Sequence, residues 1–137
     1  MGVEIDITYE GDLHCRAVHG PSGAVIQTDA PVDNQGRGEA FSPTDLLATS
    51  LGVCMMTVMG IYARRKSIDL TGTRVHVVKE MIADPDRRIG ALTLTFDLPA
   101  SVPEEWRAAL ERAGMTCPVH HSLHLLVRRD IEFRYTL

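Results

Sequence analysis

A run of 18 residues without a charged side chain, Leu46–Ala63, limits the folds open to this chain of 137 residues. A helix that is apolar on all sides is normally buried. A chain of this size can hardly surround such a helix alone, so we expect a partner subunit to cover part of it. The run approaches the ~20 residues of a bilayer span, but it includes threonine, serine and glycine. We therefore expect a central helix and no membrane partner.

The residues on both sides of this run are those that begin and end a helix. Ser42 suits the N-cap, Pro43 suits the first helical position, and Asp45 stands three residues after Ser42, as in a capping box. Basic residues at 64–66 complement the negative end of the helix dipole. The sequence thus predicts a helix from about Pro43 to Lys66.

The other predicted elements come in groups. Alternation of apolar and polar residues between turn signals predicts six strands, and apolar spacing predicts two shorter helices. The order is three strands, the long helix, a hairpin, two helices and a last strand. This order favours an α+β fold with antiparallel sheets around a central helix, in one domain over residues 1–137. The expected strands are 3–9, 13–19, 24–28, 73–83, 89–98 and 127–135, and the expected short helices are 101–114 and 117–126.

Charge and cysteine content narrow the classes of function. The formal net charge is −4 and no basic stripe is present, so a nucleic-acid partner is not expected. The start of the chain is acidic and lacks the apolar segment of a secretory signal. Three cysteines do not suggest a disulfide framework. We expect a cytoplasmic protein whose cysteines are buried, catalytic or metal-binding.

Two of the cysteines lie in contrasting settings. Cys54 is in the middle of the predicted long helix, and Cys117 follows 63 residues later, directly before Pro118 at the expected start of a short helix. A buried helical thiol and a second thiol at a helix start suit a redox couple, in which one sulfur attacks and the other resolves. The alternative is that they are small apolar core residues, which is the expectation for Cys15 in a predicted strand.

Histidines near the second cysteine suggest another possibility. His120, His121 and His124 follow Cys117 closely, and on a helix His120 and His124 would share a face. This spacing is that of a half-site for zinc or copper. No second tight cluster supplies the remaining ligands, so we expect no metal and interpret these histidines as solvated or hydrogen-bonded.

Two motifs resemble a known family. The segment Ser42–Ala48 (SPTDLLA), with a cysteine 12 positions after Ser42, is similar to the [NS]-P-x-[DE]-L-L…C signature of the OsmC/Ohr superfamily. The later Cys117-Pro118-Val119 resembles the second cysteine in the OsmC-like (YhfA-like) branch of this superfamily. The order of predicted elements matches the family along essentially the whole chain.

The resemblance implies a fold, an assembly and a mechanism. The fold would be an OsmC-like fold in an intertwined homodimer, with two long helices between the sheets. The activity would be a thiol-dependent peroxidase that reduces organic hydroperoxides in oxidative or osmotic stress, with no cofactor. Cys54 would be the peroxidatic sulfur and Cys117 the resolving sulfur. An external dithiol would reduce the resulting disulfide.

The chain departs from the best-studied members at the residues that activate the thiolate. Pro21 stands where those members have an arginine, and Thr44 stands where they have a glutamate. An apolar setting raises the pKa of a thiol, so another group has to offset the burial. The candidates for thiolate activation or substrate binding in this chain are Arg37, Glu39 and Asp45, with Arg16 as a weaker one.

Two other functions stay open. The dimer could be a non-catalytic binding module whose cleft holds an apolar ligand or a metal near Cys117–His124. It could also be a redox-sensing or structural partner protein in which a disulfide forms slowly and changes a surface. Consumption of a hydroperoxide, and its loss in Cys54→Ser, distinguishes the enzyme from both.

Overall fold

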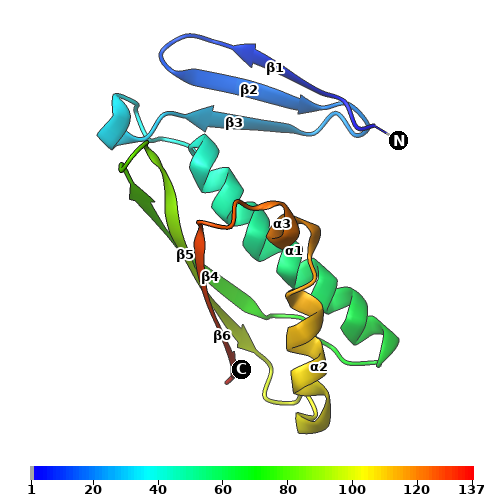
Figure 1. Cartoon of the computed structure of the whole chain (residues 1–137). Coiled ribbons are helices and arrows are strands. Elements are labelled where there is room, and N and C mark those ends of the chain that lie inside the picture. Colours follow the sequence, from blue (N-terminus) through cyan, green and yellow to red (C-terminus); the bar gives the residue numbers. More distant parts are fainter. Residues whose placement is uncertain (1) are drawn as a thin grey trace. The chain divides into compact units, whose positions relative to one another are not determined.

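The computed structural model describes residues 2–137, and Figure 1 shows their helices and strands. They form two compact units, an N-terminal one that ends at Leu47 and a C-terminal one over Ala48–Leu137. The α+β class predicted from the sequence is confirmed. The elements are β1 (Ile5–Tyr9), β2 (His14–His19), β3 (Val25–Asp29), the 3-10 helix η1 (Val32–Asn34), α1 (Pro43–Arg65), β4 (Arg74–Ile82), β5 (Arg88–Leu98), α2 (Glu104–Gly114), α3 (Pro118–Ser122) and β6 (Arg128–Tyr135).

The N-terminal unit contains a three-stranded antiparallel sheet in the order β1-β2-β3, as predicted. Its registers pair Ile7 with Ala17 and Ala17 with Ile26, so these side chains project from one face. This face is apolar and open to solvent, and Ile7 is 69% exposed. We use the name apolar row for its exposed members Ile5, Ile7, Tyr9 and Ile26.

The C-terminal unit contains a second sheet in the order β4-β5-β6. Strands β4 and β5 form the predicted antiparallel hairpin, with an irregularity between Glu80 and Met81. Strand β6 pairs with β5 in parallel, so the expectation of antiparallel pairing is wrong at this pair. The physical reason is the connection, because α2 and α3 lie between β5 and β6 in the chain and provide the crossover that a parallel pair requires.

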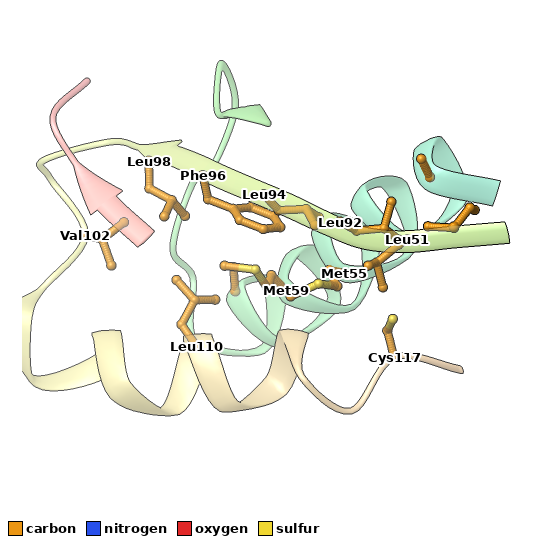
Figure 2. Packing of buried hydrophobic residues seen from close by; sticks show 13 residues of the cluster. Leu51, Met55, Met59, Leu92, Leu94, Phe96, Leu98, Val102, Leu110 and Cys117 are labelled. Carbon is orange, nitrogen blue, oxygen red and sulfur yellow. The ribbon is translucent and has the colours of Figure 1, made fainter. Parts of the chain in front are cut away.

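Strand β5 lies at the centre of the hydrophobic core, and side chains from α1 and α2 pack against it (Figure 2). Gly52 allows α1 to approach the sheet closely, since a Cβ at this position would lie 3.2 Å from Val77 and 3.4 Å from Val75. A larger residue would force these side chains or the helix to move. The fully buried side chains include Leu51, Met55, Met59, Leu92, Leu94, Phe96, Leu98, Leu110 and Cys117.

The start of α1 has the predicted capping box. Ser42 Oγ accepts a hydrogen bond from the backbone N–H of Asp45 at 3.0 Å, and Asp45 Oδ2 accepts one from the backbone N–H of Ser42 at 2.9 Å. Arg64 and Arg65 occupy the last turn. The predicted helix is therefore confirmed, and it ends one residue before Lys66.

Much of α1 is not covered by its own chain. Val53 and Ile61 are 60% and 50% exposed. By length and composition alone the helix would pass for a membrane span, and 33% of its most apolar window is buried. Core helices of soluble proteins meet the same criterion, so this feature is weak evidence for a membrane. The exposure agrees with the expectation that this chain alone cannot surround the helix.

The helix after Cys117 is shorter than predicted, since α3 ends at Ser122 and not near Leu126. The Ser122 hydroxyl donates to the carbonyl of Pro118 at 2.8 Å, and side-chain bonds of this kind compete with helix continuation. The chain then turns, and the backbone N–H of Val127 donates to the carbonyl of His124 at 3.1 Å.

Candidate functional site

The structure brings together the two cysteines of the predicted redox couple. Cys54 lies on α1 and is half-buried, whereas Cys117 immediately precedes α3 and is fully buried. Both thiols are free, and their side chains lie close enough together for Cys54 to raise the pKa of Cys117. Figure 2 shows the sulfur of Cys117 pointing toward α1.

The local sequence explains the position of the buried sulfur. Cys117 is the N-cap of α3, with an extended backbone (φ −64°, ψ 144°), and Pro118 occupies the first helical position. A residue before proline disfavours the helical conformation, so the Cys-Pro pair itself defines the helix start. The Sγ of Cys117 accepts a hydrogen bond from the backbone N–H of His120 at 3.2 Å.

Burial dominates the electrostatics of Cys117. Burial raises the pKa of this thiol and the neighbouring Cys54 side chain raises it further, while the hydrogen bond from the His120 amide opposes both. Cys117 therefore keeps its proton at neutral pH. Of the two cysteine side chains, only that of Cys54 is partly exposed to solvent.

The three other predicted site residues belong to the N-terminal unit and have local interactions there. Asp45 completes the capping box of α1. The backbone N–H of Glu39 donates to Asp29 Oδ2 at 3.1 Å. Arg37 lies close enough to Asp29 to help lower the pKa of that carboxyl, although the hydrogen bond from His14 has the larger effect. A role for Arg37, Glu39 or Asp45 in thiol chemistry stays a prediction.

The loop that carries Arg37 and Glu39 is held by an ion pair that was not predicted from the sequence. His14 Nδ1 lies 2.7 Å from Asp29 Oδ1, and Asp29 is only 3% exposed. Their hydrogen bond raises the pKa of His14 and lowers the pKa of Asp29. Because Asp29 also accepts the N–H of Glu39, this pair connects both ends of the loop.

The histidines after Cys117 do not assemble a metal site. Among residues 2–137, no group of three or more His, Cys, Asp or Glu side chains is arranged to hold an ion. Because α3 ends at Ser122, His124 lies outside the helix and does not share a face with His120. The Nδ1 of His124 instead accepts the backbone N–H of Leu126 at 3.0 Å.

Two polar atoms near α3 are buried and have no hydrogen-bond partner within the described part of the chain, His120 Nδ1 and Arg129 Nε. Burial, and next the charge of Arg129, lower the pKa of His120, so its imidazole is neutral at pH 7. Arg129 is not among the site residues predicted from the sequence. A signal was nevertheless present, because Arg129 alternates in phase with Ile131 and Phe133, which pack against the core.

Comparison with known proteins establishes the family. The family model described as OsmC-like protein matches residues 36–131. A structure from Psychrobacter arcticus, of a proposed osmotic stress induced and detoxification response protein, is 44% identical, with a TM-score of 0.90 over 95% of this chain and 94% of that chain. The chain therefore belongs to the OsmC family. No protein of curated function matches it in sequence.

More distant solved structures share the fold. An organic hydroperoxide resistance protein OsmC from Legionella pneumophila is 14% identical, with a TM-score of 0.77 over 98% of this chain and 97% of that chain. An organic hydroperoxide resistance protein from Elizabethkingia anophelis is also 14% identical, with a TM-score of 0.77 over 99% and 97%. At these identities the likeness concerns the fold alone.

Proposed function

We propose that this protein is a thiol-dependent peroxidase that reduces organic hydroperoxides through Cys54 and Cys117. The observation that carries the proposal is the proximity of the two cysteine side chains, one buried and one half-buried. Relatives named for osmotic stress, detoxification and organic hydroperoxide resistance support the same class of reaction. We assign the protein to an oxidative or osmotic stress response in the cytoplasm.

The reaction proceeds in three balanced steps. The thiolate of Cys54 attacks the terminal oxygen of the hydroperoxide, the O–O bond breaks, and the leaving alkoxide takes up a proton to give an alcohol. Cys54 is then a sulfenic acid. The sulfur of Cys117 attacks the sulfur of Cys54, a disulfide forms, and the hydroxyl group leaves as water with the proton of Cys117. An external dithiol reduces the disulfide and is itself oxidised.

The activating group for Cys54 has to come from somewhere other than the arginine and glutamate of the best-studied members. Cys117 retains its proton, and its S–H can donate to the sulfur of Cys54. A donated hydrogen bond favours the charged form of its acceptor. When Cys117 later attacks, the backbone N–H of His120 stabilises its developing thiolate. Arg37 and Glu39 are the further candidates for substrate binding.

We also propose that the working form is a homodimer. The apolar row of the N-terminal sheet and the exposed apolar side chains of α1 are surfaces that soluble monomers rarely leave open to water. A second copy of this chain is the occupant that the family resemblance implies.

Variants of the three cysteines test the peroxidase. Cys54→Ser is expected to abolish consumption of cumene hydroperoxide in the presence of a dithiol, because no sulfur remains to attack. Cys117→Ser is expected to stop at a sulfenic acid on Cys54, detected as a dimedone adduct. Cys15→Ser is the matched control and should keep its activity. Unchanged consumption by Cys54→Ser would refute the peroxidase and favour the non-catalytic binding module.

A further inference from the structure

Arg129 is a cation on the core side of the C-terminal sheet. In the parallel ladder of β5 and β6 it lies opposite Leu92, which is fully buried. Residues directly opposite each other in a sheet project from the same face. Arg129 therefore points to the face that carries the hydrophobic core, where a charge is costly unless it is paired.

The guanidinium of Arg129 has only some of the hydrogen-bond acceptors that it needs, and it has no ion-pair partner among the described residues. Its Nη2 donates to the carbonyl of His124 at 2.9 Å, but its Nε is buried without an acceptor, and no carboxylate in residues 2–137 forms an ion pair with it. The two other arginines of β6 differ in this respect. Arg128 pairs with an aspartate at 2.9 Å, and so does Arg134. The core-facing arginine of β6 is thus the one that lacks a counter-charge.

His120 has a second buried polar atom without a partner, and its ring lies near this cation. Its Nδ1 is buried without a partner, and its ring lies close enough to Arg129 for that charge to act on it. A neutral imidazole can present Nδ1 as an N–H donor. The backbone N–H of the same residue donates to Cys117 Sγ at 3.2 Å, so His120 connects the two unpartnered atoms with the thiol pair.

We propose that Arg129 and His120 form a subsite for the carboxylate of an acidic organic hydroperoxide, beside the Cys54–Cys117 pair. A carboxylate supplies the missing counter-charge and accepts from both Arg129 Nε–H and His120 Nδ1–H. Val119, Leu123 and Val127, in the same segment of the chain, pack against the core and suit the hydrocarbon body of such a substrate. This inference rests on the proposed peroxidase function and concerns which hydroperoxides the site selects.

Two hydroperoxides with the same skeleton test the subsite, para-carboxylated cumene hydroperoxide and its methyl ester. The measured quantity is the rate constant for formation of the Cys54–Cys117 disulfide. Arg129→Gln should slow the acid about tenfold or more, as expected for a lost hydrogen bond to a charged group, and leave the ester within about twofold. Arg129→Lys keeps the charge and should recover part of the acid rate. Arg128→Gln is the matched control and should change neither rate.

Binding without turnover separates the subsite from the peroxidase. The acid para-isopropylbenzoate contains the carboxylate but no peroxide, and its methyl ester is the control ligand. The acid should raise the Tm of the wild type and of Arg128→Gln, and the ester should not. The shift should be lost in Arg129→Gln and in His120→Leu.

The outcomes assign any failure to one proposal or the other. If the acid binds in this pattern but no hydroperoxide is consumed, the subsite stands and the peroxidase is refuted. The opposite outcome has three parts: both hydroperoxides produce the Cys54–Cys117 disulfide, they react at equal rates in the wild type, and the acid para-isopropylbenzoate does not bind. In that case the peroxidase stands and the subsite is refuted. Equal slowing of acid and ester in a folded Arg129→Gln or Arg129→Lys also overturns the subsite, since Arg129 would then only support the turn at His124.

Discussion

The two sheets of this protein differ in the exposure of their apolar side chains. In the C-terminal sheet, Leu94 and Phe96 of β5 are fully buried, whereas Ile7 and Tyr9 of β1 in the N-terminal sheet are 69% and 63% exposed. Both strands have the same alternation of apolar and polar residues in the sequence. Alternation therefore identifies an apolar face of a strand but does not reveal what covers that face.

This difference distinguishes the C-terminal sheet, which its own chain covers, from the N-terminal sheet, which we propose is covered by a second copy. The C-terminal unit covers its sheet with its own helices and contains both cysteines of the proposed couple. The N-terminal sheet leaves the apolar row open. Substitutions in β5 should therefore affect folding, and substitutions in the apolar row should affect assembly.

The largest effect on stability is expected at the centre of the C-terminal core. Leu94→Ala should lower the free energy of unfolding by about 2–5 kcal/mol, because it leaves a cavity in a fully buried site. Urea unfolding followed by circular dichroism measures the loss. Leu125→Ala is the matched control, since Leu125 is 92% exposed and its truncation should cost less than about 0.5 kcal/mol. Equal losses in the two variants would contradict the assignment of the core.

A charge in the apolar row should break the proposed dimer. Ile7→Lys is expected to weaken self-association by about a hundredfold or more, because it places a charge in each copy at an apolar side chain that the proposed dimer buries. Sedimentation velocity over a range of concentrations measures the change. Thr8→Lys adds the same charge on the opposite face of β1 and should remain dimeric. A wild type that is monomeric at all concentrations would disprove the homodimer.

The loop between β3 and α1 should depend on pH through His14 and Asp29. The pKa of His14 is raised from 6.5, so its contribution to stability is complete below pH 6.5 and is lost as the pH rises through the raised value. The pKa of Asp29 is lowered from 3.8, so its contribution is present above pH 3.8 and is lost as the pH falls through the lowered value. The ion pair therefore contributes most to stability between pH 3.8 and pH 6.5.

A variant of His14 isolates this effect from other titrations. The difference in Tm between the wild type and His14→Gln should shrink as the pH is raised above the ordinary pKa of histidine. His19→Gln is the matched control, because the partner of the His19 ring is an uncharged group, the hydroxyl of Ser22 at 2.6 Å, whereas the partner of His14 is a carboxylate. A difference between wild type and His14→Gln that stays constant across this range would contradict the ion pair.

The smallest effect is expected for a surface ion pair between two strands of the C-terminal sheet. Arg134 Nε lies 2.9 Å from Asp97 Oδ1, and the arginine side chain is half exposed. Asp97→Asn should lower the stability only slightly, since solvent screens exposed pairs. Chemical denaturation at low and high salt should show a difference between wild type and variant that diminishes with added salt. A loss as large as that of Leu94→Ala would place this pair among the main sources of stability.

Most of the fold could be predicted from local signals. The capping bonds of Ser42 and Asp45 join residues three positions apart, so the start of α1 is readable from the sequence. The parallel pairing of β6 is not readable in this way, because alternation in Arg128–Tyr135 defines a face of the strand and not its neighbour. The early end of α3 depends on the side-chain bond from Ser122, which competes with an apolar pattern that suggested a longer helix.

The candidate site is less accessible from the sequence. Cys54 and Cys117 are 63 residues apart, and their proximity depends on how the start of α3 packs against α1. The family resemblance implies this proximity, but the spacing of the two residues in the sequence does not. The sequence shows that Arg129 lies on the same face of its strand as the core residues. The lack of a counter-charge becomes visible only in the three-dimensional structure, where the neighbouring side chains are placed.

The most direct test of the proposed redox couple is mass spectrometry of the reduced protein after addition of an equimolar amount of cumene hydroperoxide. Intact mass counts the thiols that are lost, and peptide mapping identifies the residues that are joined. Rapid formation of a disulfide between Cys54 and Cys117, with Cys15 still reduced, is the predicted result. Two free thiols at Cys54 and Cys117 after minutes of exposure would contradict the account.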